Sequence, residues 1–248
     1  MGKLLLGVNI DHVVTLRQAR YREMLHSPNA EPSVLEAALV SEKAGADSIT
    51  VHLRADRRHI QDADVILLRE KIGTKLNLEM GNTAEILEIA LKVKPDFVCL
   101  VPENRQEVTT EGGLDVAGQK AALQVTVKAL QANGTKVSMF IDPDLEQVRA
   151  SAEIGADMVE LHTGTFANAS GAARSSEVAR LRDAAVLGHG LGLQINAGHG
   201  LTTANLPELF AVPHLVELNI GHHLVSRSIF IGLEAAVREM REVMNGYQ

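Results

Sequence analysis

The sequence is rich in histidine, the side chain best suited to proton transfer near neutral pH. Ten of its 248 residues are histidines. Seven of them lie at or just after the end of a segment with β-strand character: His12, His52, His59, His162, His199, His222 and His223. His26, His189 and His214 have no such position. Because catalytic residues of barrel folds gather where the strands end, this distribution predicts an acid–base site.

Two carboxylates accompany these histidines. Glu79 shares a strand face with Asn77, Glu160 shares one with His162, and the residues adjacent to both glutamates are apolar. A carboxylate on an inner face is rare without a partner, and a glutamate with a raised pKa can share proton transfer with histidine. We therefore expect Glu79 to be functional. A lone strand histidine such as His52 could equally be a satisfied core residue.

Basic and glycine-containing segments in the same places suit phosphate groups. Arginine offers two parallel N–H donors, and glycine lets backbone N–H groups approach an anion. The candidates after the first two strands are Arg17, Arg20, Arg54, Arg57, Arg58 and His59, and those after the last two are Gly198, His199, Gly200, Gly221 and His222. For the arginines, a solvated surface is the alternative.

A metal centre would be a rival use for the histidines. Neither HExxH nor HxH occurs in the sequence, and the adjacent residues Asp11 and His12 point to opposite faces of a strand. His52, His162 and His199 could still meet in the fold, so a zinc hydrolase is an alternative. We nevertheless expect no metal.

Eight short β-rich segments must position these residues. They cover residues 4–10, 48–53, 75–80, 97–101, 136–141, 158–163, 193–198 and 215–221. Helices are predicted between them for residues 34–45, ending at Gly45, and for 84–92, with Asn82 as the N-cap. A final helix is predicted for residues 233–244 from the helical spacing of its apolar residues.

This alternation predicts parallel strands joined by helices. Eight units in about 250 residues match a (β/α)8 or TIM barrel. We expect one domain over residues 1–248, with additional short helices, because no linker-like break in composition occurs. A doubly wound open sheet is the alternative. The similar segments 45–52 and 155–162 suggest a half-barrel repeat, or only a recurrent glycine helix stop before a strand.

Alternation within the strands predicts which side chains face inward, because residues i and i+2 share a face. The polar sets are Asn9 and Asp11; Thr50, His52 and Arg54; Asn77 and Glu79; Glu160 and His162; Asn196 and Gly198; and Glu217, Asn219 and Gly221. Buried polar groups are costly unless paired or solvated. We therefore expect a polar cavity at the C-terminal rim of the barrel.

Composition excludes several other classes of protein. A net charge of −7 and only five Phe, two Tyr and no Trp argue against nucleic-acid binding. The single cysteine, Cys99, rules out an internal disulfide. No apolar run of 18 residues occurs, and the N-terminal apolar segment ends too early for a signal peptide. We expect a cytoplasmic protein that does not bind membranes.

Several long motifs resemble the pyridoxine 5′-phosphate synthase family, the ring-closing enzymes of one vitamin B6 route. They are GVNIDHVVTLRQAR (7–20), ITVHLRADRRHI (49–60), NLEM (77–80), LVPENRQEVTTEGGLDV (100–116), ELHTG (160–164), NAGHGL (196–201) and ELNIGH (217–222). They stand in the family's order over nearly the whole chain. The resemblance implies a transferase-class synthase with a TIM-barrel fold.

The resemblance also implies roles for individual residues. His52 and Glu79 would be general bases, His199 a general acid, and Glu160 a stabiliser of the transition state. The residues contacting 3-amino-2-oxopropyl phosphate would be Asn9, Arg20, Gly200, Gly221 and His222. Those contacting 1-deoxy-D-xylulose 5-phosphate would be Asp11, His12, Arg54, His59 and Thr109.

The implied reaction condenses these two substrates, closes a pyridine ring and releases phosphate and water, with no cofactor. The family further implies a homo-octamer. Lys75 and Lys136 stand at strand starts, at the wrong end for the site, so we expect the imine to form between the two substrates. The alternative of another class is a sugar-phosphate-binding barrel without catalysis, which would tolerate loss of Glu79 and His52.

Two irregular segments complete the expectations. Residues 102–114 are polar and contain Gly112 and Gly113, as in a lid or binding loop. Residues 21–33 are longer than the usual family form. Because this longer segment follows Arg20 directly, Arg20 need not take the position in the site that the family resemblance implies.

Overall fold

Eight parallel strands close into a barrel in the computed structural model of the chain, which describes residues 3–25, 27–103 and 112–247. The strands are β1 (Leu5–Asn9), β2 (Ser48–His52), β3 (Lys75–Met80), β4 (Phe97–Leu100), β5 (Lys136–Ile141), β6 (Met158–His162), β7 (Gln194–Gly198) and β8 (Leu215–Ile220). Each pairs with the next, and β8 pairs with β1. The predicted (β/α)8 barrel is confirmed, and the open doubly wound sheet is excluded.

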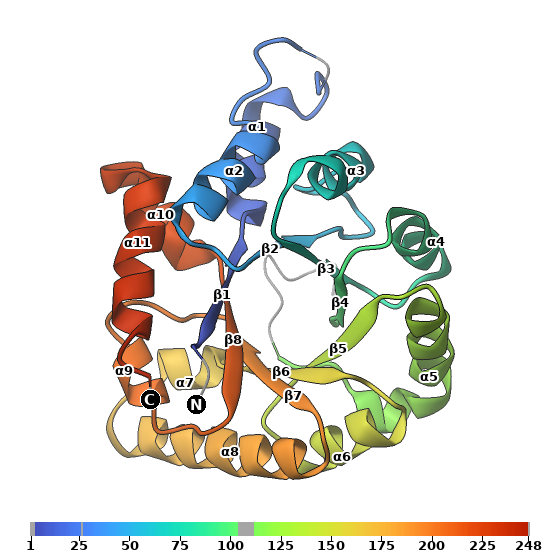
Figure 1. Cartoon of the computed structure of the whole chain (residues 1–248), viewed down its shortest axis with the longest axis vertical. Coiled ribbons are helices and arrows are strands. Elements are labelled where there is room, and N and C mark those ends of the chain that lie inside the picture. The colour runs from blue at the N-terminus through green and yellow to red at the C-terminus, as the bar shows by residue number, and fades with distance from the viewer. Residues whose placement is uncertain (1–2, 26, 104–111, 248) are drawn as a thin grey trace.

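Helices surround the barrel on its outside (Figure 1). They are α1 (Asp11–Tyr21), α2 (Val34–Ala44), α3 (Asp62–Lys71), α4 (Ala84–Val93), α5 (Val116–Ala132), α6 (Leu145–Glu153), α7 (Gly164–Asn168), α8 (Gly171–Gly190), α9 (Leu206–Leu209), α10 (His222–Ile231) and α11 (Leu233–Met244). The helix predicted for residues 233–244 has the predicted bounds and buries its apolar stripe. No helix among the described residues is both long and apolar enough to cross a membrane.

Helix starts follow local capping chemistry. The sequence placed the N-cap of α4 at Asn82, which is wrong by one residue. The side chain of Thr83 accepts the hydrogen bond from the Ile86 amide, while Asn82 accepts one from Thr126 on α5. The irregular segment predicted for residues 21–33 begins one residue later, because Tyr21 ends α1, and its described part from residue 22 contains no helix or strand.

The outward strand faces form the apolar core against the helices. Leu6, Val8, Ile49 and Val51 on β1 and β2 are fully buried there, and the other strands repeat the pattern. The inward face is polar in the six strands where the alternation predicted it, while Cys99 on β4 and Phe140 on β5 form a small apolar cluster there with Val101.

Polar side chains also fill the barrel below the strand ends, where only the rim was expected to be polar. Thr50 donates to Asn219 (3.0 Å), and Asn219 donates to Glu160 (2.6 Å). Deeper still, Ser48 donates to Glu217. These groups satisfy one another, which offsets the cost of burying them.

Three aspartates fasten neighbouring strands at the opposite, N-terminal end of the barrel. Asp47, Asp96 and Asp157, here called the aspartate latches, stand just before β2, β4 and β6. Their carboxylates accept hydrogen bonds from the backbone N–H groups of Leu6, Leu76 and Val137 on β1, β3 and β5, at 2.9, 3.0 and 2.8 Å.

The latches explain the similarity between residues 45–52 and 155–162. In both segments a glycine takes a positive φ after a helix, and the aspartate two residues later forms a latch. Lys94 takes the same left-handed conformation before Asp96. The arrangement thus recurs before every second strand from β2 to β6, and the similarity does not require half-barrel duplication.

Candidate active site

A cavity of about 460 Å³ opens at the C-terminal ends of the strands. Its lining comprises Asn9, Asp11, His12, His52, Arg54, His59, Glu79, Val101, Phe140, Glu160, Asn168, His199, Gly200, Leu201, Thr202, Asn219, Ile220, Gly221, His222, His223 and Ser226. Twelve predicted site residues are therefore brought together: Asn9, Asp11, His12, His52, Arg54, His59, Glu79, Glu160, His199, Gly200, Gly221 and His222.

Six of the ten histidines line this cavity. His162, the seventh predicted at the rim, lies in an adjoining cavity that shares His199. Its Nδ1 is 3.0 Å from Asp142. His189 and His214 stack on each other, with ring centroids 3.9 Å apart, outside both cavities. The clustering inferred from strand ends thus holds among the described histidines.

The two predicted carboxylates occupy unusual electrostatic environments. Burial raises the pKa of Glu79 well above its ordinary value, the nearby charges of Glu160 and Asp11 raise it further, and a hydrogen bond from Asn9 opposes the rise. Burial raises the pKa of Glu160 to about 7 despite the hydrogen bond from Asn219. Both carboxyl groups therefore hold their protons to higher pH than an exposed glutamate does, and Glu160 exchanges its proton near neutral pH.

His52 lies beside Glu79 on the neighbouring strand, in register with it. Its Nδ1 is 3.9 Å from the carboxylate of Glu79. Its backbone N–H donates to Asp11 (2.9 Å), and Asp11 is held in turn by the side-chain amide of Asn9 (3.0 Å). Asp11 is the first residue of α1 rather than part of a strand, yet its side chain reaches the cavity.

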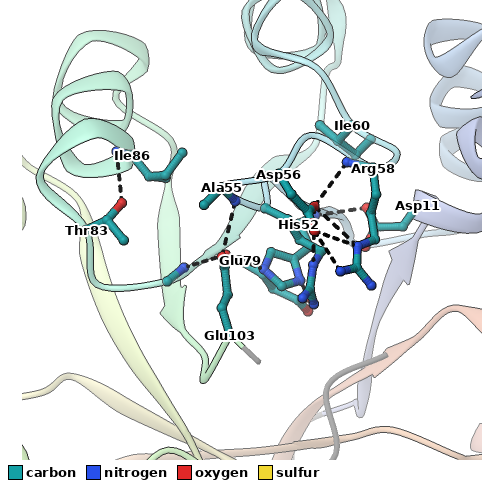
Figure 2. Close-up of polar contacts among 12 residues, drawn as sticks. Asp11, His52, Ala55, Asp56, Arg58, Ile60, Glu79, Thr83, Ile86 and Glu103 are labelled. Carbon is teal, nitrogen blue, oxygen red and sulfur yellow. Dashed lines mark hydrogen bonds and ion pairs between the residues drawn. The ribbon is translucent and has the colours of Figure 1, made fainter. Parts of the chain in front are cut away.

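A further carboxylate, Glu103, approaches His52 from the other side (Figure 2). Its Oε1 is 3.1 Å from Nε2 of His52. Sequence reasoning missed Glu103, because it stands two residues beyond the last predicted strand position, in a segment that was interpreted only as a loop. Asn219 was assigned to the inward face but not to the site. The alternation that places Asn219 on the inward face was the sequence signal that could have identified it as a site residue.

His199 combines an unusual backbone with an unusual pKa. Its φ of 82° lies in the left-handed region, which residues other than glycine seldom adopt and which recurs at functional sites. Burial and, to a lesser extent, the neighbouring His162, His12 and His222 together lower its pKa to about 4. The ring is therefore neutral at pH 7.

Gly200, Gly221 and His222 line the cavity beside the ends of β7 and β8, where TIM barrels often bind phosphate. Gly221 precedes the N-terminus of α10, a ten-residue helix that begins at His222. Free N–H groups at such an end favour negative charge. A Cβ at Gly221 would lie 3.0 Å from the Cβ of Asn9, and one at Gly200 would lie 2.7 Å from the Cβ of Ala167.

Arg54 and His59 form a second basic group across the cavity. Both side chains are buried and line it. The neighbouring arginines do not join them: Arg57 pairs with Asp62 and Glu85, at 2.6 Å each, and Arg58 pairs with Asp56 at 2.6 Å.

Two predicted substrate contacts are not found in the cavity. Arg20 is exposed at the end of α1, over the ring of Tyr21, because the helix carries it away from the strand ends. Its expected contact with a substrate phosphate stays a prediction. Arg17 pairs with Asp64. Thr109 and most of the predicted lid lie outside the described residues.

A metal could be held by Asp11, His52 and Glu79, whose candidate ligand atoms lie within 4.8 Å of one another. The trio predicted from sequence was instead His52, His162 and His199, and His162 lies in the adjoining cavity. All three members of the candidate set already have hydrogen-bond or ion-pair roles in the site.

Comparison with known proteins gives a consistent assignment. The family model described as pyridoxal phosphate biosynthesis protein PdxJ matches residues 6–246. A pyridoxine 5′-phosphate synthase of Akkermansia muciniphila is 58% identical, with 98% of this chain and 99% of the relative covered. The enzyme of that name from Opitutus terrae is 53% identical, with the same coverage of both chains.

Two solved structures of low sequence identity share the fold of the chain. Phosphoribosyl anthranilate isomerase from Thermus thermophilus superposes with a TM-score of 0.62 at 14% identity, covering 99% of this chain and 100% of that one. The Amycolatopsis orientalis BexX/CysO complex gives a TM-score of 0.62 at 16% identity, covering 99% and 90%.

Proposed function

The chain belongs to the PdxJ family of pyridoxal phosphate biosynthesis proteins, and from this we infer that its cavity catalyses the pyridoxine 5′-phosphate synthase reaction. In that reaction 3-amino-2-oxopropyl phosphate and 1-deoxy-D-xylulose 5-phosphate are joined, the pyridine ring closes, and phosphate and water leave. The observation that carries the assignment is the full-length identity of 53–58% to enzymes of this name, combined with a polar cavity built from the family's motifs.

Two phosphorylated substrates need two anion subsites, and the cavity offers two. The subsite of Gly200, Gly221 and His222 would hold the phosphate of the amino ketone, with Asn9 beside it. Arg54 and His59 would hold the phosphate of the deoxy sugar. Binding both substrates in one cavity makes their condensation effectively unimolecular.

The acid–base roles follow from the electrostatics. Burial raises the pKa of Glu79, and the positive charge of the substrate ammonium would favour its ionised form. It would then take a proton from the amine or from carbon, with His52 as the second base. Glu160, with a pKa of about 7, would stabilise developing positive charge when ionised. His199 is neutral in the empty site, and the negative charge of bound phosphate would favour the protonated form that a general acid needs.

We place the imine between the two substrates, because the described cavity lining includes no lysine. Lys75 and Lys136 are exposed at the far ends of β3 and β5. The condensation therefore uses the amine of one substrate and the carbonyl of the other.

An assembly of several copies, a homo-octamer by analogy with the family, would cover apolar surface on α1 and α10. Leu16, Ile229 and Phe230 are 67%, 75% and 81% exposed there, which is unusual for large apolar side chains that come in a group. The biosynthetic assignment and the single buried thiol of Cys99 fit a cytoplasmic location.

The decisive experiment is a turnover assay with both substrates, in which the pyridine product is followed by its absorbance. Product should form only when both are present and should still form in excess chelator. Borohydride added during turnover should leave no adduct on a lysine. Binding of both sugar phosphates without product would instead indicate a non-catalytic barrel.

A further inference from the structure

Glu103 makes three hydrogen bonds that join the ends of three consecutive strands. Its Oε1 accepts from the Gly81 amide just after β3 and lies 3.1 Å from Nε2 of His52, the last residue of β2. Its Oε2 accepts from the Ala55 amide (3.1 Å) in the loop that follows β2. Glu103 itself follows β4. Figure 2 shows its carboxylate beside Ala55 and His52.

The two backbone amides can only donate, so both oxygens of Glu103 act as acceptors, as those of an ionised carboxylate do. Burial raises the pKa of its carboxyl, but the hydrogen bonds from His52, Ala55 and Gly81 together bring that pKa below its ordinary value. Glu103 is therefore an anion at neutral pH. The two carboxyl groups face different nitrogens of the His52 ring, Glu103 at Nε2 and Glu79 at Nδ1.

The arrangement fixes the imidazole tautomer. A carboxylate can only accept, so the Nε2 of His52 must carry the proton that it shares with Glu103. The lone pair then lies on Nδ1, which faces Glu79 across 3.9 Å. A histidine oriented in this way by a carboxylate keeps one nitrogen free as a base and stabilises the charge that forms when it takes a proton.

We propose that Glu103 is a positioning residue for the condensation, which holds His52 in the Nε2–H tautomer with Nδ1 as the basic atom. This inference deepens the proposed function and rests on it. Glu103 does not touch the reacting atoms in this scheme. It acts through His52. Because Glu103 follows β4, the orientation of the His52 ring depends on the path of the chain after that strand.

The test is the Glu103→Gln variant. An amide has one acceptor and one donor, so it cannot accept from Ala55 and from the Gly81–His52 side together. We expect kcat to fall by about 10²- to 10³-fold, with KM for both substrates changed by less than about threefold, as when a carboxylate that orients a catalytic histidine is neutralised.

Glu42 provides a matched control. Its carboxylate also accepts from two consecutive backbone amides, those of Gly73 and Thr74 at 2.8 and 2.7 Å, but none of its hydrogen bonds involves a histidine. Glu42→Gln should lower the melting temperature without lowering kcat. An equal fall in kcat for both variants would reduce Glu103 to a structural residue and overturn the proposal.

Two further measurements separate positioning from general damage. Long-range proton–nitrogen spectra of histidine-labelled protein should show protonated Nε2 at His52 in the wild type and a mixture of tautomers in Glu103→Gln. On a His52→Asn background, Glu103→Gln should change kcat by less than about twofold. A wild-type Nδ1–H tautomer, or a full loss of rate on that background, would refute the proposal.

The tautomer can be read without turnover. If the wild-type protein makes no product, the proposed function fails, while the spectra still decide whether Glu103 sets the state of His52.

Discussion

Asn219 donates a hydrogen bond from its side-chain amide to the carboxyl group of Glu160 across the barrel interior, with 2.6 Å between Nδ2 and Oε2. The same Asn219 accepts from Thr50, so its amide cannot turn over without losing a partner. The bond favours the ionised form of Glu160, and burial favours the protonated form. The balance between them leaves the pKa of Glu160 at about 7.

Removing this donor should shift the pH dependence of the enzyme. In Asn219→Ala the pKa of Glu160 rises above about 7, because only burial and repulsion by Glu217 remain. A hydrogen bond to a charged group is worth about 1.5–3 kcal/mol, or roughly one to two pKa units. If ionised Glu160 is the active form, the acidic limb of kcat/KM moves to higher pH by that amount. Asn77→Ala, which removes a buried amide bonded to Thr50 instead, should leave the limb in place.

Glu79→Gln should abolish turnover while preserving the fold. Loss of a general base costs on the order of 10²- to 10⁴-fold in rate. The folded-state pKa of Glu79 is raised, so the folded protein retains a proton that the unfolded chain releases above about pH 4.5. The wild type therefore loses stability as pH rises from there toward the raised pKa, and the variant does not.

Urea unfolding at pH 5 and pH 8 measures this difference. The stability of Glu79→Gln relative to wild type should increase between the two pH values. Glu88→Gln, at an exposed carboxylate partnered by Lys92, should show no such gain. A Glu79→Gln variant with near wild-type kcat would exclude the base role.

Phosphate should change the titration of His199. In the empty site its pKa is about 4, so its ring protons should not shift in NMR spectra between pH 6 and 8. Saturating inorganic phosphate should raise the pKa into a measurable range, because an anion favours the imidazolium. His199→Asn assigns the resonance. An empty enzyme in which His199 titrates near 6.5 would contradict the burial argument.

Buried histidines should contribute a loss of stability in mild acid. Burial lowers the pKa values of His12, His59, His199 and His223. Below about pH 6.5 these histidines bind protons in the unfolded chain but not in the folded protein, so their contribution to stability is lost as pH falls toward the folded-state values. The raised pKa values of Glu79 and Glu160 act in the opposite direction, so the effect is measured as a difference. From pH 7 to pH 5 the melting temperature of the wild type should fall relative to that of His223→Asn, and a constant difference would contradict the prediction.

The glycine subsite is testable through its geometry. Gly200 has a φ of 76°, and a Cβ there would lie 2.7 Å from Ala167. Gly200→Ala should cost roughly 1–2 kcal/mol in stability from the left-handed conformation alone and raise KM for the amino-ketone phosphate more than it lowers kcat. Gly190→Ala, where no heavy atom lies within 4 Å of the added Cβ, is the control. If Gly200→Ala and Gly190→Ala had equal KM values for the amino-ketone phosphate, the assignment of Gly200 to the phosphate subsite would be wrong.

Strand positions and inward faces could be predicted because they depend on local alternation. Thr50, His52, Glu79, Glu160 and Asn219 have the predicted parity, and the cavity follows from it. The motifs then supplied chemical roles that alternation alone cannot assign.

Other features of the site could not be predicted, because they depend on contacts between segments that are distant in the sequence. Glu103 lies beyond β4 and becomes visible only when the ends of β2 and β3 are brought beside it. Arg20 matches a motif by position, but α1 carries it to the surface. The low pKa of His199 arises from burial and from histidines distant in the chain.

The aspartate latches join the strands of the barrel in pairs that are close in the sequence. Each latch joins two consecutive strands, with donor and acceptor at most 41 residues apart. Bringing such close segments together costs little loop-closure entropy. The pairing of β8 with β1, where Leu5 meets Glu217, instead joins the two ends of the chain. In kinetic terms we expect β1–β2, β3–β4 and β5–β6 to be the early folding units, and closure at the β8–β1 seam to be the slow, long-range step that completes the barrel.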